Sequence, residues 1–310
     1  MFKVECFDSW KAYDGASEGS GRSEKEWLIS ESGEIGLFKY PKFDPKDQKE
    51  TTEHISEHLA HQLGCVLNIP TARVDIGVRG GRIGSMSYLV RSQNQTLVEG
   101  ITFISGKYPK FSVETLKDEE TGIHYCVEHI FNSVPEIVPS RIWIEMMLFD
   151  FLIGNADRHQ SNWALLLNFD PDDSSCVQVR RCPLYDNGSS LCSYVNKGQV
   201  EEYLGKDLNR FKSLVDTKSK SIIRIDGNSK SRPTHRDVAK YLLENYPIAR
   251  MISKRIVDTL TENNINKIME QYPADILDPR KNMLIRRYLL GKTEILLSLL
   301  HSEEGNNAIP

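Results

Sequence analysis

The chain has 310 residues, of which 39% are hydrophobic and 26% charged, and its formal net charge is −4. This composition is typical of a soluble globular protein with room for a two-lobed domain, and it argues against a disordered chain. The sequence pI of about 6.1 lacks the basic balance of a nucleic-acid-binding protein, so we expect no direct binding of nucleic acid.

Cysteine usage and hydropathy indicate the compartment. The six cysteines are scattered without a C-x-x-C pair, which is not typical of a zinc site or a disulfide framework and fits a reducing compartment. The first residues carry charges where a signal peptide needs an apolar run. The longest apolar stretch, 142–153, is interrupted by Glu145 and Asp150 and is too short to cross a bilayer. We expect a cytoplasmic protein without a membrane span.

The N-terminal part predicts a small β-rich lobe with one helix. Its predicted elements are a hairpin with strands at 27–29 and 35–39, a helix at 51–63, and two strands at 72–78 and 83–90. A Gly/Ser-rich run at 15–23 precedes the hairpin. In the helix, Ile55, Leu59 and Leu63 recur at four-residue spacing, and we expect Gly64 to end it.

From about residue 140 the sequence predicts an α-rich lobe. Its predicted elements are a buried helix at 141–153, strands at 163–169 and 177–184 around a turn at 170–175, an irregular stretch at 189–233, and three helices between 234 and 300. Residues 103–131 are interpreted as an insertion of short helices that connects the lobes. We therefore expect an α+β, bilobal fold, with an N-lobe at 1–92 and a C-lobe at 93–310.

Two motifs carry the chemistry. The stretch LIGNADRHQSNW contains D-x-H-x-x-N, with Asp157, His159 and Asn162. In a kinase catalytic loop, an Asp takes the proton of the attacking hydroxyl and an Asn five positions later holds a metal ion. Downstream, the stretch PLYDNG places Asp186 where a kinase has its main Mg²⁺ ligand, and the intervening hairpin would bring Asp186 beside Asn162. The structural alternatives are a helix-capping turn at Asp157, backbone contacts for His159 and an Asx turn at Asp186.

Phosphoryl transfer also needs positive charge near the nucleotide phosphates. Lys39 ends a predicted strand, and Glu57 in the following helix is placed to hold Lys39 as an ion pair. Solvated surface positions are the alternative for both residues. The Gly/Ser run at 15–23 is a candidate phosphate loop, with a flexible linker as its alternative.

These residues resemble the HipA-like serine/threonine kinases, in particular the short CtkA type. Besides the two motifs, Ser56-Glu57-His58-Leu59-Ala60 resembles the helix of the family that pairs with its nucleotide-binding lysine. The stretches LFKYP and GRSEK resemble the lysine-bearing strand and the phosphate loop. The resemblance implies a bilobal, protein-kinase-like fold, ATP and Mg²⁺ as cofactors, and a Ser or Thr hydroxyl of a protein as the acceptor.

The resemblance also assigns roles to individual residues. It makes Asp157 the base, with His159 beside it, gives Asn162 and Asp186 to the metal and Lys39 to the phosphates, and pairs Glu57 with Lys39. Gly19, Ser20, Gly21, Ser23 and Val90 complete the predicted cofactor-binding set. In HipA-type members a serine before the phosphate loop is autophosphorylated and the enzyme is then inactive. Many members pair with a DNA-binding antitoxin, so an antitoxin is a candidate partner here.

Two alternatives remain open. D-R-H-x-x-N also resembles the catalytic loop of phosphoinositide kinases, and the stretch 189–232 contains several basic residues, so a lipid acceptor is the second hypothesis. The third is a pseudokinase or interaction module, although such a protein usually lacks at least one of Lys39, Asp157, Asn162 and Asp186.

Overall fold

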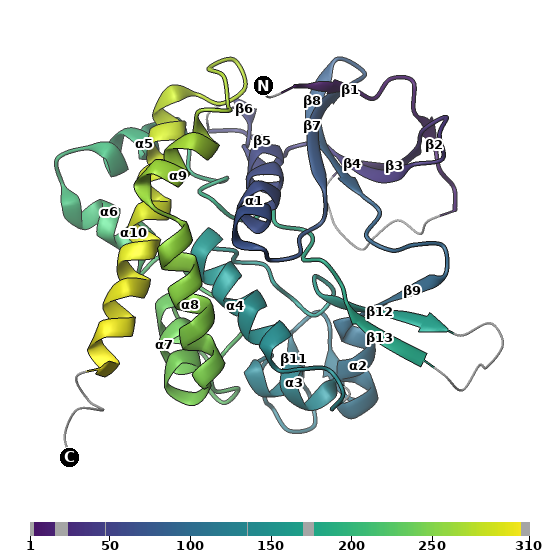
Figure 1. Ribbon diagram of the computed structural model, residues 1–310, viewed down its shortest axis with the longest axis vertical. Coiled ribbons are helices and arrows are strands. Elements are labelled where there is room, and N and C mark those ends of the chain that lie inside the picture. Colours follow the sequence, from purple (N-terminus) through teal and green to yellow (C-terminus); the bar gives the residue numbers. More distant parts are fainter. Residues whose placement is uncertain (1–2, 16–23, 47, 135, 170–176, 305–310) are drawn as a thin grey trace.

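The computed structural model describes residues 3–15, 24–46, 48–134, 136–169 and 177–304. A six-stranded sheet with the order β1-β7-β8-β4-β3-β2 occupies the N-terminal part (Figure 1). Neighbouring strands are antiparallel, except that β1 and β7 are parallel. The strands are β1 (Glu5–Cys6), β2 (Lys11–Ala12), β3 (Lys25–Ile29), β4 (Ile35–Lys39), β7 (Val74–Arg79) and β8 (Arg82–Tyr88). The four strands predicted here are present, with ends shifted by at most two residues.

Helix α1 (Glu53–Leu67) packs against β7 and β8 and carries Glu57. The side chains of Ile55, Leu59 and Leu63 are fully buried, as their spacing predicts. A short strand pair, β5 (Phe43–Asp44) and β6 (Lys49–Glu50), leads from the end of β4 into this helix.

The predicted end of this helix at Gly64 is wrong. The helix continues to Leu67 and ends with Asn68 in the left-handed conformation, at φ 52°. Asparagine tolerates that conformation better than most residues, so it replaces glycine as the terminal residue. Gly64 serves close packing instead, because a Cβ atom there would overlap the side chain of Thr71.

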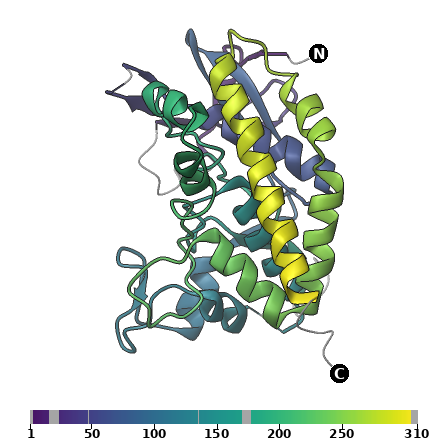
Figure 2. The ribbon, with the colours of Figure 1, turned by 90° about the vertical axis from the view of Figure 1, so that its left-hand side faces the viewer.

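The C-terminal part is built around α4 (Arg141–Ile153), which has the predicted bounds and whose side chains from Trp143 to Ile153 are all buried. Helices α7, α8 and α10 pack against α4. The other helices of this part are α5 (Lys197–Leu204), α6 (Leu208–Val215), α7 (His235–Asn245), α8 (Pro247–Thr259), α9 (Glu262–Met269) and α10 (Pro279–Glu304). Helix α10 runs along one side of the molecule and contacts α5, α7, α8 and α9 (Figure 2).

Two predictions for the C-terminal part are wrong. The stretch predicted to be irregular contains α5 and α6, and the described residues after 234 form four helices instead of three. Helices α5 and α6 bury only Val200, Tyr203 and Val215, so their apolar faces are too small to stand out in the sequence. Their starts are fixed by side-chain caps at Asn196 and Asp207.

A second sheet connects the two parts. Strand β12 (Ala164–Phe169) lies between β9 (Gln95–Glu99) and β13 (Val177–Arg181), antiparallel to both. The strands predicted at 163–169 and 177–184 are present, although the second ends at Arg181, and β9 was not predicted. The predicted turn at 170–175 lies outside the described residues. The predicted insertion contains the helices α2 (Gly100–Lys107) and α3 (Val127–Ser133), and also a small hairpin, β10 (Phe111–Ser112) and β11 (Lys117–Asp118), that was not predicted.

The molecule therefore has a β-rich N-terminal part and a larger helical C-terminal part. The lobe boundary between residues 92 and 93 stays a prediction. No helix within the described residues is long and apolar enough to cross a membrane.

Candidate active site

The candidate loop begins where α4 ends. Gly154 terminates α4 in the left-handed conformation, at φ 67°. A Cβ atom at this position would overlap the hydroxyl group of Tyr288 on α10. Only glycine fits both the backbone conformation and the available space, so the sharp turn into the D-x-H-x-x-N segment is fixed here.

Hydrogen bonds inside this segment bring Asp157 and Asn162 together. The Asp157 N–H donates to Asn155 Oδ1 at 3.0 Å, and Asn162 Nδ2 donates to the Asp157 carbonyl at 2.8 Å. The Asn162 N–H donates to the His159 carbonyl at 2.9 Å. The Asn162 side chain is therefore bonded to the backbone of Asp157, five residues earlier.

Arg158 lies beneath the loop with only 1% of its surface exposed. Its guanidinium group forms an ion pair with Asp150 of α4 at 2.8 Å. It also donates to the carbonyl oxygens of Asn162 and Tyr185, each at 2.7 Å, and to Asn187 Oδ1 at 2.6 Å. One buried side chain thus joins α4, the D-x-H-x-x-N loop and the residues on both sides of Asp186.

The segment that carries Asp186 is docked against the N-terminal part. Leu184 forms a parallel bridge with Thr71, just after α1. Asp186 then adopts a positive φ of 55°, which is uncommon for a residue with a side chain and occurs often at functional sites. The next N–H, that of Asn187, donates to Glu57 Oε2 at 2.9 Å.

Lys39, Glu57 and Asp186 form an ion cluster between the two parts of the molecule. Lys39 Nζ lies 2.8 Å from Glu57 Oε1 and 2.7 Å from Asp186 Oδ1. The Glu57 side chain is 3% exposed, whereas that of Asp186 is 45% exposed. The buried glutamate fixes the lysine, and the aspartate keeps one side open to solvent. The predicted Lys39–Glu57 pair is present.

The electrostatics of the two aspartates differ. The charge of Lys39 lowers the pKa of Asp186 to about 2 against the opposing effect of burial. Burial raises the pKa of Asp157, the charge of His159 opposes this, and the charge of Asp186 adds to it. Burial acts against the charged form of Lys39, but the two carboxylates outweigh it and raise its pKa. Asp186 is thus held ionised beside a carboxyl group that binds a proton more readily than usual.

A pocket of about 270 Å³ collects most of those predicted site residues that the structure describes. Its walls include Lys39, Glu57, Asp157, His159 and Asp186. Asn162 lies behind this wall and is 5% exposed. Its amide and the Asp186 carboxylate offer the oxygen donors that Mg²⁺ prefers, so the donor set fits this metal.

Val90 is the one other residue of the predicted cofactor-binding set that the structure describes, and it does not line this pocket. Val90 packs against the buried cluster of Ala164, Leu166 and Cys182. Gly19, Ser20, Gly21 and Ser23 lie outside the described residues. The roles predicted for all five stay predictions.

Known proteins share this architecture. The chain is 22% identical over 291 residues to the serine/threonine-protein kinase CtkA of Helicobacter pylori, across 89% of this chain and 84% of the relative. The chain is therefore similar in sequence to CtkA. The crystal structure of the proinflammatory kinase CtkA from Helicobacter pylori matches 97% of this chain and 98% of its own, with a TM-score of 0.77 and 17% identity. HipA of Shewanella oneidensis, in a complex with HipB and operator DNA, matches 94% of this chain and 68% of its own, with a TM-score of 0.56 and 15% identity.

No family model matches the chain. The predicted resemblance and the α+β, kinase-like fold are confirmed.

The sequence analysis did not predict the residues that support this site. Arg158 was visible only as the middle residue of D-R-H, and Asp150 only as an acid inside an otherwise apolar helix. An acid in such a helix needs a buried partner, and that was the available signal. A group of hydrogen bonds at the edge of the pocket was also not predicted. In this group, Lys42 and the Tyr194 hydroxyl both donate to Glu53 at the start of α1.

Proposed function

We propose that this HipA-like kinase homologue is an ATP- and Mg²⁺-dependent protein serine/threonine kinase. The observation that carries the proposal is the convergence of Lys39, Glu57, Asp157 and Asp186 on one pocket, with Asn162 directly behind Asp157. These side chains come from β4, α1, the loop after α4 and the segment after β13. A scaffold without catalytic function does not require that arrangement, which argues against the pseudokinase alternative.

In this proposal each residue has one task. Lys39 neutralises phosphate charge, and Glu57 keeps the lysine in place. Asn162 and Asp186 would hold Mg²⁺, which neutralises charge on the transferred phosphoryl group when bound. Asp157 accepts the proton of the acceptor hydroxyl while the acceptor oxygen bonds to the γ-phosphorus and the bond to the β-phosphate oxygen breaks. The raised pKa of Asp157 favours this proton transfer.

The same proposal includes the acceptor and the partners. The acceptor is a Ser or Thr hydroxyl of a protein, with autophosphorylation as one case, and an antitoxin is a candidate partner. All the cysteines within the described residues are free, which fits the cytoplasm as the proposed location. Binding to anionic liposomes would test the lipid-kinase alternative.

The test is transfer of labelled γ-phosphate from Mg·ATP to the chain itself and to proteins of a cell extract. Asp157→Asn keeps the shape of the side chain and removes the base, so the transfer rate should fall about 10²- to 10⁴-fold. The thermal midpoint should stay close to that of the wild type. Unchanged transfer by Asp157→Asn would refute the assignment of the base, and absence of transfer by the wild-type protein to every acceptor would refute the proposed activity.

A further inference from the structure

A buried lysine lies behind the candidate active site. Lys292 of α10 has no exposed surface and no ion pair with any residue that the structure describes. Its Nζ atom donates to Ser219 Oγ at 2.8 Å. It also lies 4.7 Å from the centre of the Phe151 ring and 5.4 Å from that of Tyr288. The amino group therefore contacts one neutral hydroxyl and two aromatic faces.

A chain of hydrogen bonds leads from Lys292 to the candidate loop. Ser219 Oγ is 2.9 Å from His235 Nδ1, and His235 Nε2 is 2.9 Å from the carbonyl oxygen of Asn155. Because a carbonyl oxygen only accepts, Nε2 carries the ring proton and Nδ1 accepts from the Ser219 hydroxyl. Ser219 in turn accepts from Lys292. Donors and acceptors alternate without conflict along the whole chain.

The hydrogen-bond chain ends at the Asn155 carbonyl, and the side chain of the same residue makes the connection to Asp157. The side chain of Asn155 donates to Asp150 Oδ1 at 3.3 Å and accepts from the Asp157 N–H at 3.0 Å. Tyr288, one turn before Lys292 on α10, closes off the space beside Gly154. Tyr288 of α10 thus packs against Gly154, and His235 at the start of α7 binds Asn155. These are the two residues at which the polypeptide turns toward Asp157.

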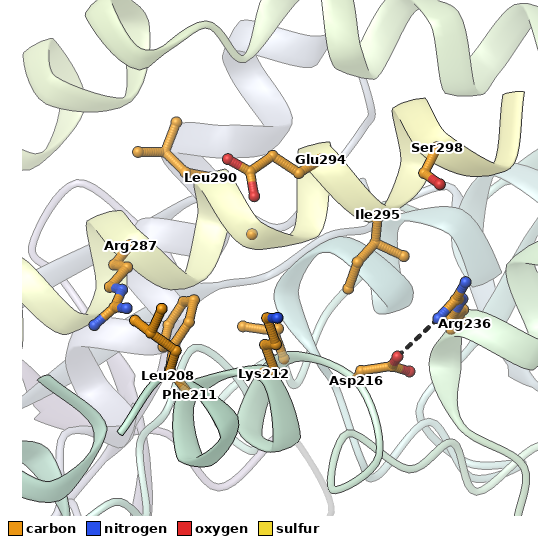
Figure 3. A pocket seen from close by; sticks show the side chains of 12 residues that line it. Leu208, Phe211, Lys212, Asp216, Arg236, Arg287, Leu290, Glu294, Ile295 and Ser298 are labelled. Atoms are coloured by element: carbon orange, nitrogen blue, oxygen red, sulfur yellow. Dashed lines mark hydrogen bonds and ion pairs between the residues drawn. The ribbon is translucent and has the colours of Figure 1, made fainter. Parts of the chain in front are cut away.

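Burying the Lys292 amino group and the His235 ring lowers the stability of the folded protein. Burial lowers the pKa of Lys292 to about 7, and Asp216 is the main charge that opposes the shift. Asp216 does not contact Lys292: it pairs with Arg236 at 2.9 Å in the wall of a groove of about 590 Å³ between α6 and α10 (Figure 3). Burial likewise lowers the pKa of His235, to about 3, and the charge of Lys292 adds to this. An apolar residue at position 292 would avoid these costs, so the lysine indicates a role beyond stability.

We propose that Lys292, Ser219 and His235 are positioning residues that hold the Asp157 loop in its reactive conformation. Helix α10 would then contribute to phosphoryl transfer without touching the substrate or the nucleotide. The inference rests on the proposed kinase activity for its rate measurement, but its structural part is independent of that activity.

The first test compares Lys292→Met with Thr293→Val. Thr293 is the next residue on α10 and is 8% exposed, and its hydroxyl donates to the Leu290 carbonyl of the same helix at 2.8 Å. For Lys292→Met we expect kcat to fall about ten- to hundredfold, because small displacements of a reacting group have effects of this size. The KM for ATP should be unchanged, since Lys39, Glu57 and Asp186 are untouched. The thermal midpoint should be equal to or above that of the wild type.

The two variants separate positioning from simple stabilisation. A residue that only stabilises the fold would lower the midpoint when replaced and leave kcat intact below that temperature. An unchanged kcat in Lys292→Met, or a loss of the same size in Thr293→Val, would overturn the proposal.

The second test uses His235→Gln and His235→Leu. The glutamine amide can still donate to the Asn155 carbonyl, whereas leucine cannot, so His235→Gln should retain clearly more of the kcat. Equal loss in both variants would show that this hydrogen bond does not position the loop.

Hydrogen exchange of residues 154–162 decides the inference even if the wild type transfers no phosphate. We expect faster amide exchange in this loop in Lys292→Met and His235→Leu, with exchange in α8 unchanged. Exchange that is the same as in the wild type would overturn the positioning role. Absent phosphate transfer with faster loop exchange would refute the proposed function alone.

Discussion

Lys39 and Lys292 are both held inside the protein, and their surroundings are opposite. Lys39 lies between two carboxylates, which raise its pKa, at the edge of an open pocket. Lys292 contacts a hydroxyl and two aromatic rings, and burial lowers its pKa to about 7. The first lysine keeps its charge, and the second acts mainly as a hydrogen-bond donor.

The difference separates two layers of the site. The open layer contains Lys39 and Asp186 at the pocket, and the buried layer contains Arg158 and Lys292 behind it. Side chains in the open layer are charged and partly accessible, so their replacement should change ligand binding and reaction rate more than stability. Side chains in the buried layer support the loop, so their replacement should change stability, except where the buried group itself lowers stability. The predictions below test this division.

The largest effect should come from the buried layer. Arg158→Met leaves Asp150 as a buried carboxylate without its partner, which should lower the free energy of unfolding by about 3–5 kcal/mol. Urea unfolding measures the change. The double variant Asp150→Asn and Arg158→Met should recover part of the loss, because the unpaired charge is gone. A loss of unfolding free energy below about 1 kcal/mol in the single variant would show that Arg158 does not belong to the buried layer.

In the open layer, Lys39→Met should lower activity, and because it also leaves the buried Glu57 carboxylate without its ion-pair partner, activity is compared well below the thermal midpoint of the variant. Without Lys39 the phosphate charge is not compensated, and we expect kcat/KM for ATP to fall about 10²- to 10³-fold. The pKa of Asp186 should rise, because the charge of Lys39 is the main cause of its low value. Lys11→Met, which removes an exposed lysine from the same sheet, is the control and should retain full activity. Comparable activity of the two variants would contradict the proposed nucleotide site.

The last prediction concerns the pH dependence of stability. Between pH 7 and the ordinary lysine pKa of 10.5, the unfolded chain holds a proton that folded Lys292 has released. The unfolded state therefore binds more protons, and the contribution of Lys292 to the unfolding free energy rises with pH in this window, by up to about 1.4 kcal/mol per pH unit. Lys292→Met should remove this rise.

Urea unfolding of both proteins at several pH values from 6.5 to 10 measures the difference. The other titratable groups near Lys292, which are Asp216, His235, Cys192 and Tyr288, remain in both proteins, so their contributions largely cancel. Parallel pH profiles would show that Lys292 keeps its charge in the folded state and would contradict the distinction between the two lysines.

Much of the fold was predictable because its signals are local. The hairpin, α4 and the strands around residues 164–181 follow from apolar periodicity, and the spacing of Asp157 and Asn162 follows from a single loop. The Lys39–Glu57 pair was predictable from the order of a strand and a helix together with the family resemblance.

The buried layer was not predictable, because the residues that contact one another in it are distant in the sequence. Ser219 and Lys292 are 73 residues apart, and His235 and Asn155 are 80 apart. Lys292 lies between Leu289 and Leu296 on the apolar face of a long helix, so its burial has a signal in the sequence, but its hydrogen-bond partners do not. Gly64 shows the same limit: its tertiary contact with Thr71 overrides the usual meaning of glycine as a helix end.

The central claim is that the open layer binds Mg·ATP and the buried layer does not. The most direct test is thermal unfolding with and without Mg·ATP on the wild type, Asp186→Asn and Lys292→Met. A ligand that binds only the folded state raises the midpoint by mass action. The account predicts a rise in the wild type and in Lys292→Met, and no rise in Asp186→Asn. No rise in the wild type, or an equal rise in Asp186→Asn, would contradict it.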